Sequence, residues 1–377
     1  MSDTRGAGNK SPLLTHIITT LEERIRTGTY PGGRWLPSER ELCSEFDVSR
    51  ATLRQALVAL ERSDLVIRSA GCRPLIRALT SQPAPRNATS RRTIGLLVKD
   101  EPKYSGISLL TRGVRDAVNP DAFRLLVGGA QAATLQEVAH QEAQTLQRMI
   151  QDRDVSGIIV WYSGTIANLP VFQAVLQANI PLVFVDREPP DGIEADVVSI
   201  DNQRAAREAV QYLIHRGHQR IAHITNPEPV STLQERLAGY EEALNEAKIP
   251  LDRELILTGR LEWTTEEGAS AAEMVERLTR LSEPPTAVFA ATDFIALDFV
   301  RALQQRGLRV PEDMAVIGFD DLEQWLLHKP FLTTVRQPFE RIGYEATRLL
   351  IKRLESGVAG RSRHLLLEAP LIVRDSA

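Results

Sequence analysis

The stretch from Leu36 to Leu60 constrains the fold more than any other, because it contains two short helical patterns that almost touch along the chain. Each pattern begins directly after a serine, Ser38 in the first and Ser49 in the second. A serine in this place can accept a hydrogen bond from an unpaired N–H group of the first helical turn. Only residues 46–48 separate the two patterns. The sequence therefore predicts a tight helix-turn-helix.

The second helical pattern has two unlike faces. Arg50 and Arg54 fall on the side that is predicted to face solvent. In a helix-turn-helix, the N-terminal half of the second helix enters the DNA major groove. The same pattern also occurs in helical domains that bind no DNA. The opposite face predicts a buried stripe at the spacing i, i+3, i+4, i+7, formed by Leu53, Ala56, Leu57 and Leu60.

Several spacings around these helices agree with a known family. The segments GTYPGGRWLPSER (residues 28–40) and FDVSRATLRQAL (residues 46–57) resemble the winged helix-turn-helix of the GntR regulators. The resemblance implies that the P-S-E-R arginine and the S-R-x-T-x-R residues contact DNA. It also implies a wing of two strands, near 65–68 and 74–77, where one of the family's two glycines is absent and an arginine could make the contact instead. The candidate DNA-binding residues are Ser38, Arg40, Ser49, Arg50, Thr52, Arg54, Gly71 and Arg73.

Charge is divided unevenly along the chain. The whole protein has a net charge of −4. Residues 1–92 contain 15 Lys and Arg against 9 Asp and Glu, a net of +6, whereas the remainder contains 30 against 40, a net of −10. Such asymmetry is expected when one domain meets phosphate and the other does not.

Cysteine content and hydropathy bear on the compartment. Two cysteines, Cys43 and Cys72, are too few for a disulfide framework or a zinc cluster. The polar N-terminus lacks the apolar core of a signal peptide, and no run approaches the ~18 apolar residues of a membrane helix. We therefore expect a cytoplasmic protein with no membrane partner, metal or cofactor.

From Thr93 onward, apolar runs alternate with helical patterns. This alternation predicts parallel sheets that helices cover on both faces. More strands are expected than one sheet comfortably holds, so the sequence predicts two lobes with a cleft between them. The expected strands span residues 93–98, 123–129, 157–161, 181–186, 197–201, 220–225, 254–259, 287–292 and 315–320.

Polar residues follow three of these strands, at 186–187, 292–293 and 320–321. Binding sites in α/β sheets lie beyond the carboxyl ends of the strands, so the convergence of several polar strand ends favours a ligand pocket. An aspartate in this place can also cap a helix. We expect that role for Asp293, ahead of a helix that begins at Phe294.

A second resemblance covers residues 93–377. The segments IDNQRAAREAVQYLIHRGHQRIAHI, PPTAVFAATDFIAL and GLRVPEDMAVIGFDD resemble the effector domain of LacI-type repressors, which is related to periplasmic sugar-binding proteins. A GntR-type head on a LacI-type body resembles the arabinose-repressor subgroup. The implied fold class is α/β, with an N-terminal winged helix-turn-helix domain and a two-lobed, periplasmic-binding-protein-like domain with parallel sheets.

The second resemblance also implies an effector site. Its carboxylates can accept hydrogen bonds from paired hydroxyls, and its arginines can donate parallel bonds. Trp161 offers either a stacking platform or a core side chain, and Ser199 lies where the chain is expected to cross between lobes. Thr292 replaces a family asparagine, and Tyr104 alone offers a ring in its loop. The candidate effector-binding residues are Tyr104, Trp161, Asp186, Arg187, Ser199, Arg236, Trp263, Thr292, Asp320 and Gln337.

These readings predict a repressor whose affinity for operator DNA is controlled by a sugar-like effector. The expected segments are a disordered N-terminus (1–11), a winged helix-turn-helix (12–78), a linker (79–92) and an effector-binding domain that forms a homodimer (93–377). A nucleoside or purine effector, and a solute-binding protein without a role in DNA binding, are the alternatives. Induction and corepression both stay open. An enzyme is not expected, because the sequence lacks a G-x-S-x-G, an H-E-x-x-H and a P-loop.

Overall fold

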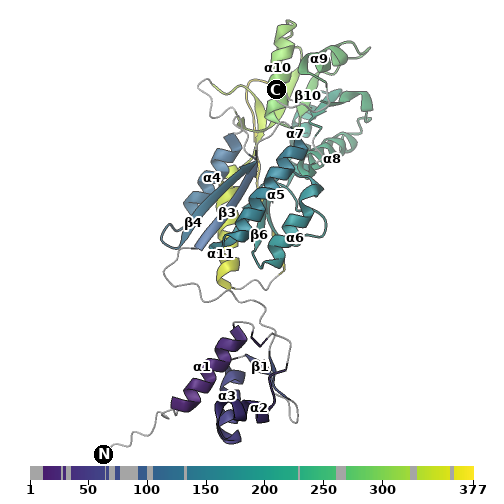
Figure 1. Ribbon diagram of the computed structural model, residues 1–377. Coiled ribbons are helices and arrows are strands. Elements are labelled where there is room, and N and C mark those ends of the chain that lie inside the picture. Colours follow the sequence, from purple (N-terminus) through teal and green to yellow (C-terminus); the bar gives the residue numbers. More distant parts are fainter. Residues whose placement is uncertain are drawn as a thin grey trace, which may run out of the picture. The chain divides into compact units, whose positions relative to one another are not determined.

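The computed structural model describes residues 12–26, 29–30, 35–63, 65–67, 73–76, 92–99, 105–130, 134–227, 230–259, 269–322, 329–356 and 361–377. The chain divides into two compact units, Met1–Ser90 and Arg91–Ala377. We call them the head and the body. Figure 1 shows the head as a small helical unit and the body as a larger unit of sheets and helices.

In its described residues, the head contains three helices and a short hairpin. Its elements are α1 (Pro12–Arg26), α2 (Glu39–Phe46), α3 (Arg50–Arg62), β1 (Val66–Ile67) and β2 (Leu75–Ile76), with β1 and β2 antiparallel. Ser38 accepts from the N–H of Glu41, whose side chain accepts from the N–H of Ser38, so α2 begins with a capping box. Ser49 caps α3 by accepting from the N–H of Thr52. The predicted helix-turn-helix and both caps are confirmed.

The buried stripe of α3 holds the head together. Leu53, Ala56, Leu57 and Leu60 are fully buried, as predicted. They share one apolar cluster with Ile17 and Leu21 of α1, Leu42 of α2 and the hairpin residues Val66 and Ile76. Arg50 and Arg54 lie on the exposed face.

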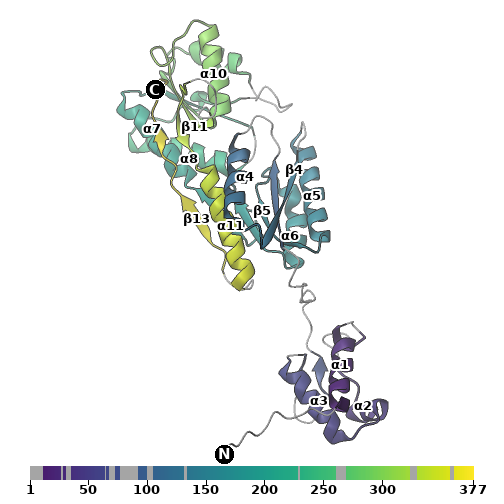
Figure 2. The same cartoon turned by 90° about the vertical axis from the view of Figure 1, so that its left-hand side faces the viewer.

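The described part of the body forms two six-stranded sheets. One sheet lies in each lobe (Figures 1 and 2). The first lobe's sheet is parallel throughout, in the order β13-β7-β6-β5-β3-β4. Its strands are β3 (Arg92–Lys99), β4 (Phe123–Ala130), β5 (Val155–Val160), β6 (Leu182–Val185), β7 (Asp196–Ile200) and β13 (His364–Leu367).

The second lobe's sheet has the order β14-β12-β11-β10-β8-β9 and is parallel except at β14. Its strands are β8 (Ile221–Thr225), β9 (Ile256–Thr258), β10 (Ala287–Ala290), β11 (Ala315–Asp320), β12 (Thr333–Arg336) and β14 (Leu371–Ile372). All nine strands predicted for the body are present, as β3 to β11, whereas β12, β13 and β14 were not predicted. The predicted α/β fold class is confirmed.

Helices cover both faces of the first sheet, as Figure 2 shows for α4 and α11 on one side and α5 and α6 on the other. Alternate strand residues explain this arrangement. Leu96 and Ile159 belong to the core shared with α4 and α11, whereas Leu97 and Ile158 belong to the core shared with α5 and α6. The helices of this lobe are α4 (Ser105–Ala117), α5 (Leu135–Gln151), η1 (Ile166–Asn168), α6 (Leu169–Gln177) and α11 (Phe339–Ser356).

The chain passes between the lobes three times, after β7, after β12 and between β13 and β14. The second lobe contains α7 (Asn202–His215), α8 (Ser231–Glu246), η2 (Arg253–Leu255), α9 (Ala271–Thr279) and α10 (Asp293–Gln305). Among the described residues, no helix combines the length and the apolar character that a membrane crossing requires.

Candidate functional sites

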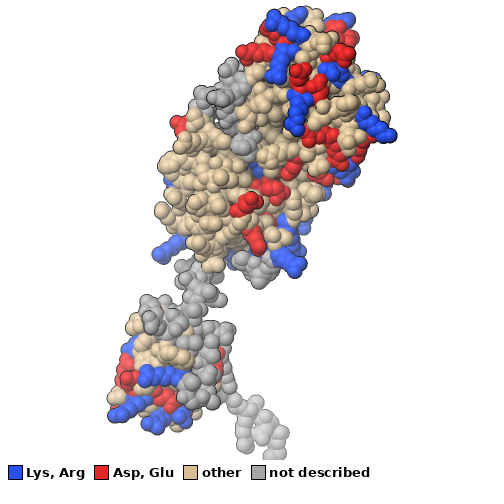
Figure 3. All heavy atoms as spheres, turned by 90° about the vertical axis from the view of Figure 1, so that its right-hand side faces the viewer, with Lys and Arg blue, Asp and Glu red and all other residues tan. Residues whose placement is uncertain are grey.

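The exposed surface of the head carries the predicted DNA-binding arginines. Arg40 on α2, Arg50 and Arg54 on α3, and Arg73 just before β2 are all exposed. Figure 3 shows Lys and Arg side chains gathered on the head, with a few acidic side chains among them. Thr52 is half-buried, and its hydroxyl lies 2.9 Å from that of Ser49. Gly71 lies outside the described residues.

In the body, polar side chains from both lobes gather near the carboxyl ends of the parallel strands. We call this the interlobe site. Its first-lobe part follows β5 and β6, where Trp161 Nε1 donates to Asp186 Oδ2 over 3.0 Å. Arg187 Nε lies 3.8 Å from the same Oδ2, and Arg187 Nη1 donates to the Tyr162 carbonyl. The Trp161 ring stacks on Phe339, which follows the second crossing.

The second-lobe part is centred on Arg236, which is 3% exposed. Its Nε donates to Asn202 Oδ1 over 3.0 Å and its Nη1 donates to the Ala291 carbonyl over 2.7 Å. Nη1 also lies 3.6 Å from Asp320 Oδ1, which accepts from Gln337 Nε2 over 2.8 Å. The guanidinium therefore joins α8, the ends of β10 and β11 and the start of α7.

Asp320 is held in position by an unusual backbone turn. Asp320 and Asp321 have φ angles of 118° and 62°, in a region that L-residues seldom adopt. Strained residues of this kind persist only where their surroundings fix them. The Asp321 carboxylate accepts from Arg336 and Arg374, each over 2.6 Å, and the N–H of Leu322 donates to Asp293 Oδ2.

The expectation that Asp293 caps α10 was wrong. The helix begins one residue earlier than expected, so Thr292 is the N-cap and accepts from the N–H of Ile295. Thr292 also donates to Asn226 Oδ1 over 3.3 Å. Asp293 is fully buried, and burial, followed by the nearby Asp320 carboxylate, raises its pKa well above the usual value.

Two further carboxylates lie close to the interlobe site. Glu235 accepts from Asn202 Nδ2 over 3.0 Å. Its pKa is raised mainly by burial, and the carboxylates of Glu188 and Asp186 add to the effect. The backbone N–H of Glu188 donates to Ser231 Oγ at the start of α8, a hydrogen bond from the first lobe to the second.

The structure thus gathers most of the described candidates. Trp161, Asp186 and Arg187 form one part of the interlobe site, Arg236, Asp320 and Gln337 form the other, and Thr292 joins it through Asn226. Ser199 is instead hydrogen-bonded to His364 Nε2 on the edge strand β13. Tyr104 and Trp263 lie outside the described residues.

Sequence reasoning missed Asn202, Asn226 and Glu235. The first two follow the carboxyl ends of β7 and β8, so the strand-end argument that selected Asp186 and Asp320 would also have found them. Glu235 carries no such signal, because its role depends on the packing of α8 against α7.

Among the buried atoms of the interlobe site, no hydrogen-bond partner lies within the described part of the chain for Asp186 Oδ1, Asn226 Nδ2 and Gln337 Oε1. Buried polar atoms are nearly always paired. Two acceptors and one donor are therefore left unsatisfied by the described residues.

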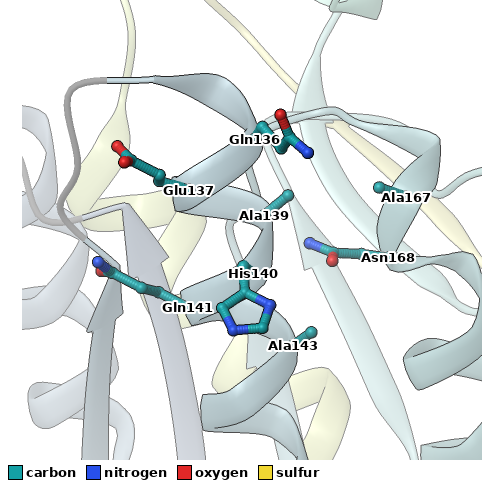
Figure 4. A pocket seen from close by; sticks show the side chains of 8 residues that line it. All are labelled: Gln136, Glu137, Ala139, His140, Gln141, Ala143, Ala167 and Asn168. Atoms are coloured by element: carbon teal, nitrogen blue, oxygen red, sulfur yellow. The ribbon is translucent and has the colours of Figure 1, made fainter.

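A separate hollow of about 730 Å³ lies on the first lobe, between α5 and η1. Figure 4 shows it bounded by Gln136 and His140 on the helix and by Asn168 opposite. None of the predicted effector residues that the structure describes lines it.

Known proteins match both units. Bacterial regulatory proteins of the gntR family match residues 13–73, and the periplasmic binding protein-like domain matches residues 210–377. The HTH-type transcriptional repressor CytR of Escherichia coli is 32% identical over 353 residues, which cover 89% of this chain and 95% of that protein.

Two solved structures are also similar. A complex of the transcriptional regulator CelR with cellobiose is 27% identical with a TM-score of 0.64, and the match covers 97% of this chain and 100% of that chain. A LacI family regulator from Enterococcus faecium with bound ribose is 25% identical with a TM-score of 0.61, and the match covers 76% of this chain and 98% of that one. The protein therefore belongs to the LacI family of HTH-type transcriptional regulators, with a head of the gntR type, and it is a DNA-binding regulator rather than an enzyme.

Proposed function

We propose that the protein is a cytoplasmic repressor that a neutral, sugar-like effector releases from its operator. In this proposal two bodies form a homodimer, which presents two heads to a pseudo-palindromic operator. The effector binds at the interlobe site and favours one arrangement of the lobes over another, as any ligand must if it is to shift an equilibrium. Arg40, Arg50, Thr52, Arg54 and Arg73 are the proposed DNA contacts.

The unpartnered atoms of the interlobe site carry the proposal. Asp186 Oδ1 and Gln337 Oε1 require donors, and Asn226 Nδ2 requires an acceptor. A hydroxyl group can donate and accept at once, so a molecule with several hydroxyls can satisfy all three atoms. The ribose of a nucleoside offers similar hydroxyls, which keeps a nucleoside as the second candidate.

The charges of the site favour a neutral molecule over an acidic one. Arg236 lies against Asp320, and Arg187 lies against Asp186. Each described arginine of the site thus has a carboxylate beside it, and Glu235 adds a further acid. An acidic sugar would bring a negative charge into a place that has no surplus of positive charge, which is costly in a buried site.

The comparisons support a sugar. One similar structure holds cellobiose and another holds ribose. The combination of a gntR-type head with a LacI-type body also supports the arabinose-repressor subgroup, for which a neutral pentose would be the effector.

A thermal-shift screen of matched pairs tests this proposal. Each neutral sugar is paired with its acid, such as glucose with glucuronate, and each nucleoside with its 5′-monophosphate. At 100 times its dissociation constant, a true effector adds about 2.7 kcal/mol to the free energy of unfolding. We expect a neutral member to raise the melting temperature and its charged partner to have no effect. Stabilisation by charged members alone would contradict the charge argument.

Variants at the interlobe site separate effector binding from DNA binding. Arg236→Ala should abolish the thermal shift, and Gln337→Leu should weaken it, because each removes a polar partner from the site. Both variants should still bind DNA. Arg236→Ala should also lower the free energy of unfolding by roughly 3–5 kcal/mol, since Asp320 is left buried without its cation. Arg277→Ala, an exposed change on α9, serves as the control. Unchanged effector binding in Arg236→Ala would refute the site.

A further inference from the structure

Arg54 has a partner that sets it apart from the other candidate arginines of the head. Its Nε lies 3.1 Å and 3.2 Å from the two carboxylate oxygens of Glu39, and its Nη2 lies 3.1 Å from Glu39 Oε2. Glu39 is the first residue of α2, and Arg54 is the fifth residue of α3. The contact therefore spans the helix-turn-helix. Within the described part of the head, neither Arg40 nor Arg50 forms a comparable ion pair.

We propose that Glu39 is a positioning residue that makes Arg54 a reader of a guanine base. Glu39 binds the Nε side of the Arg54 guanidinium. The Nη1 and Nη2 groups at the tip of Arg54 then point outward, where they donate to the O6 and N7 atoms of guanine. Arg40 and Arg50 then contribute mainly phosphate contacts. This inference rests on the proposed sequence-specific binding of DNA.

The geometry of the guanidinium leads to this assignment. The group has five N–H donors in one plane. Glu39 takes the Nε–H and one Nη2–H, which leaves both Nη1–H groups and the second Nη2–H. Two of the remaining three donors point side by side from the tip. This fork matches the paired acceptors on the major-groove edge of guanine, the commonest specific contact of an arginine with DNA.

The charge of the pair argues against a phosphate contact by Arg54. Glu39 and Arg54 together carry no net charge, so their approach to a phosphate gains little. The Glu39 carboxylate would itself be repelled by the DNA backbone. Affinity for phosphates comes from cations that displace counterions, and Arg40 and Arg50 are better suited to that role.

A simpler explanation is that Glu39 only stabilises the head. An acidic residue in the first turn of a helix interacts favourably with the helix dipole. The Arg54 and Glu39 side chains are 59% and 32% exposed, and such exposed pairs contribute little to folding. Glu39 variants should therefore fold, which makes the two explanations separable by DNA binding.

The test selects binding sites from a random duplex library with the full-length chain and its variants. The wild type should select a motif with a guanine in each half-site. Arg54→Ala should lose the preference for that guanine, and Glu39→Ala should weaken it by about tenfold. Glu39→Gln, which keeps one acceptor, should fall between Glu39→Ala and the wild type.

Affinity for a random-sequence duplex supplies a second readout. In Glu39→Ala this affinity should rise, whereas the preference for guanine should fall. The reason is that Arg54, no longer paired with Glu39, can contact a phosphate. A plot of the logarithm of the binding constant against the logarithm of the salt concentration should then become steeper by about 0.9 for each such arginine. Glu23→Ala removes the same charge from an exposed position of α1 and should leave motif and slope as in the wild type. A merely structural role would lower both kinds of affinity together.

Three outcomes would overturn the inference. If Glu39→Ala selects the wild-type motif with undiminished preference, Glu39 does not position Arg54. If Arg54→Ala keeps the motif but makes the dependence of affinity on salt concentration less steep, Arg54 contacts a phosphate. A wild type that selects no motif at all would refute the proposed sequence-specific binding, and with it this inference.

Discussion

At the scale of single residues, the packing around His223 determines whether its side chain is protonated. It is fully buried on β8, between the rings of Tyr240 and Phe289, whose centroids lie 5.2 Å and 5.3 Å away. Its Nδ1–H donates to the Phe289 carbonyl, whereas Nε2 has no partner among the described residues. Burial lowers its pKa to about 4, because a charged imidazole would lose its hydration there.

This shift predicts a loss of stability in mild acid. The folded pKa lies below the unfolded value of about 6.5, so the unfolded chain takes up the proton first as the pH falls. The free energy of unfolding should therefore decrease between about pH 6.5 and pH 4, by roughly 3 kcal/mol in all. Urea denaturation across this range measures the effect. In His223→Phe, the part of this pH dependence that comes from the histidine should vanish. The free energy of unfolding should then change with pH only through the carboxylates that both proteins share. Equal pH slopes in the two proteins would show that His223 is not the cause.

Residue-level features were predictable where the cause is local. Ser38 and Ser49 cap their helices, because a cap requires only the residues that follow it. Asp293 was assigned wrongly, since a shift of one residue in the helix start moved the cap to Thr292. The left-handed turn at Asp320 and Asp321 had no sequence signal, because distant partners such as Arg374 hold it.

At the scale of elements, α4 and α11 pack with their backbones in direct contact. A Cβ atom on Gly113 of α4 would overlap the carbonyl oxygen of Glu340 on α11. One on Gly343 of α11 would likewise overlap the carbonyl oxygen of Leu110. Glycine is required at both positions because the close approach leaves no room for a side chain.

Gly113→Ala should therefore destabilise the body. At a solvent-exposed position inside a helix, this change stabilises the helix by roughly 1 kcal/mol, because alanine is the better helix former. Here the overlap must force the helices apart, and we expect a net loss of about 1–3 kcal/mol. Chemical denaturation measures it, and Ser108→Ala on the exposed face of the same helix is the control. A stabilised Gly113→Ala protein would show that the helices do not meet in this way.

The pattern of apolar runs predicted β3 to β11 but not the last three strands. The predicted strands are apolar runs, and most of them are followed by a helical pattern. In contrast, β13 has three exposed residues and β14 has only two residues. β13 pairs with β7, whose sequence lies more than a hundred residues earlier. Such pairing at a sheet edge is decided by tertiary contacts, which the local pattern does not contain.

At the scale of the whole molecule, the two units have opposite charge. The head contains 13 Lys and Arg against 9 Asp and Glu, a net of +4, and the body contains 32 against 40, a net of −8. The basic head accounts for attraction to DNA, and the acidic body limits unspecific binding of the rest of the chain. The proposed DNA contacts lie in the head and the proposed effector contacts lie in the body. Regulation in this proposal requires a coupling free energy between the two sets of residues.

This coupling must act in both directions, which gives the final prediction. If the effector weakens operator binding by a given factor, operator DNA must weaken effector binding by the same factor. A tenfold effect corresponds to about 1.4 kcal/mol in each direction. Calorimetric titration of the effector found by the screen, with and without a saturating duplex carrying the selected motif, measures the second factor. A random duplex at the same salt concentration is the control, since it engages the head without the motif. An effector affinity that operator DNA leaves unchanged would mean that the interlobe site does not govern the head, even if each site binds its own ligand as proposed.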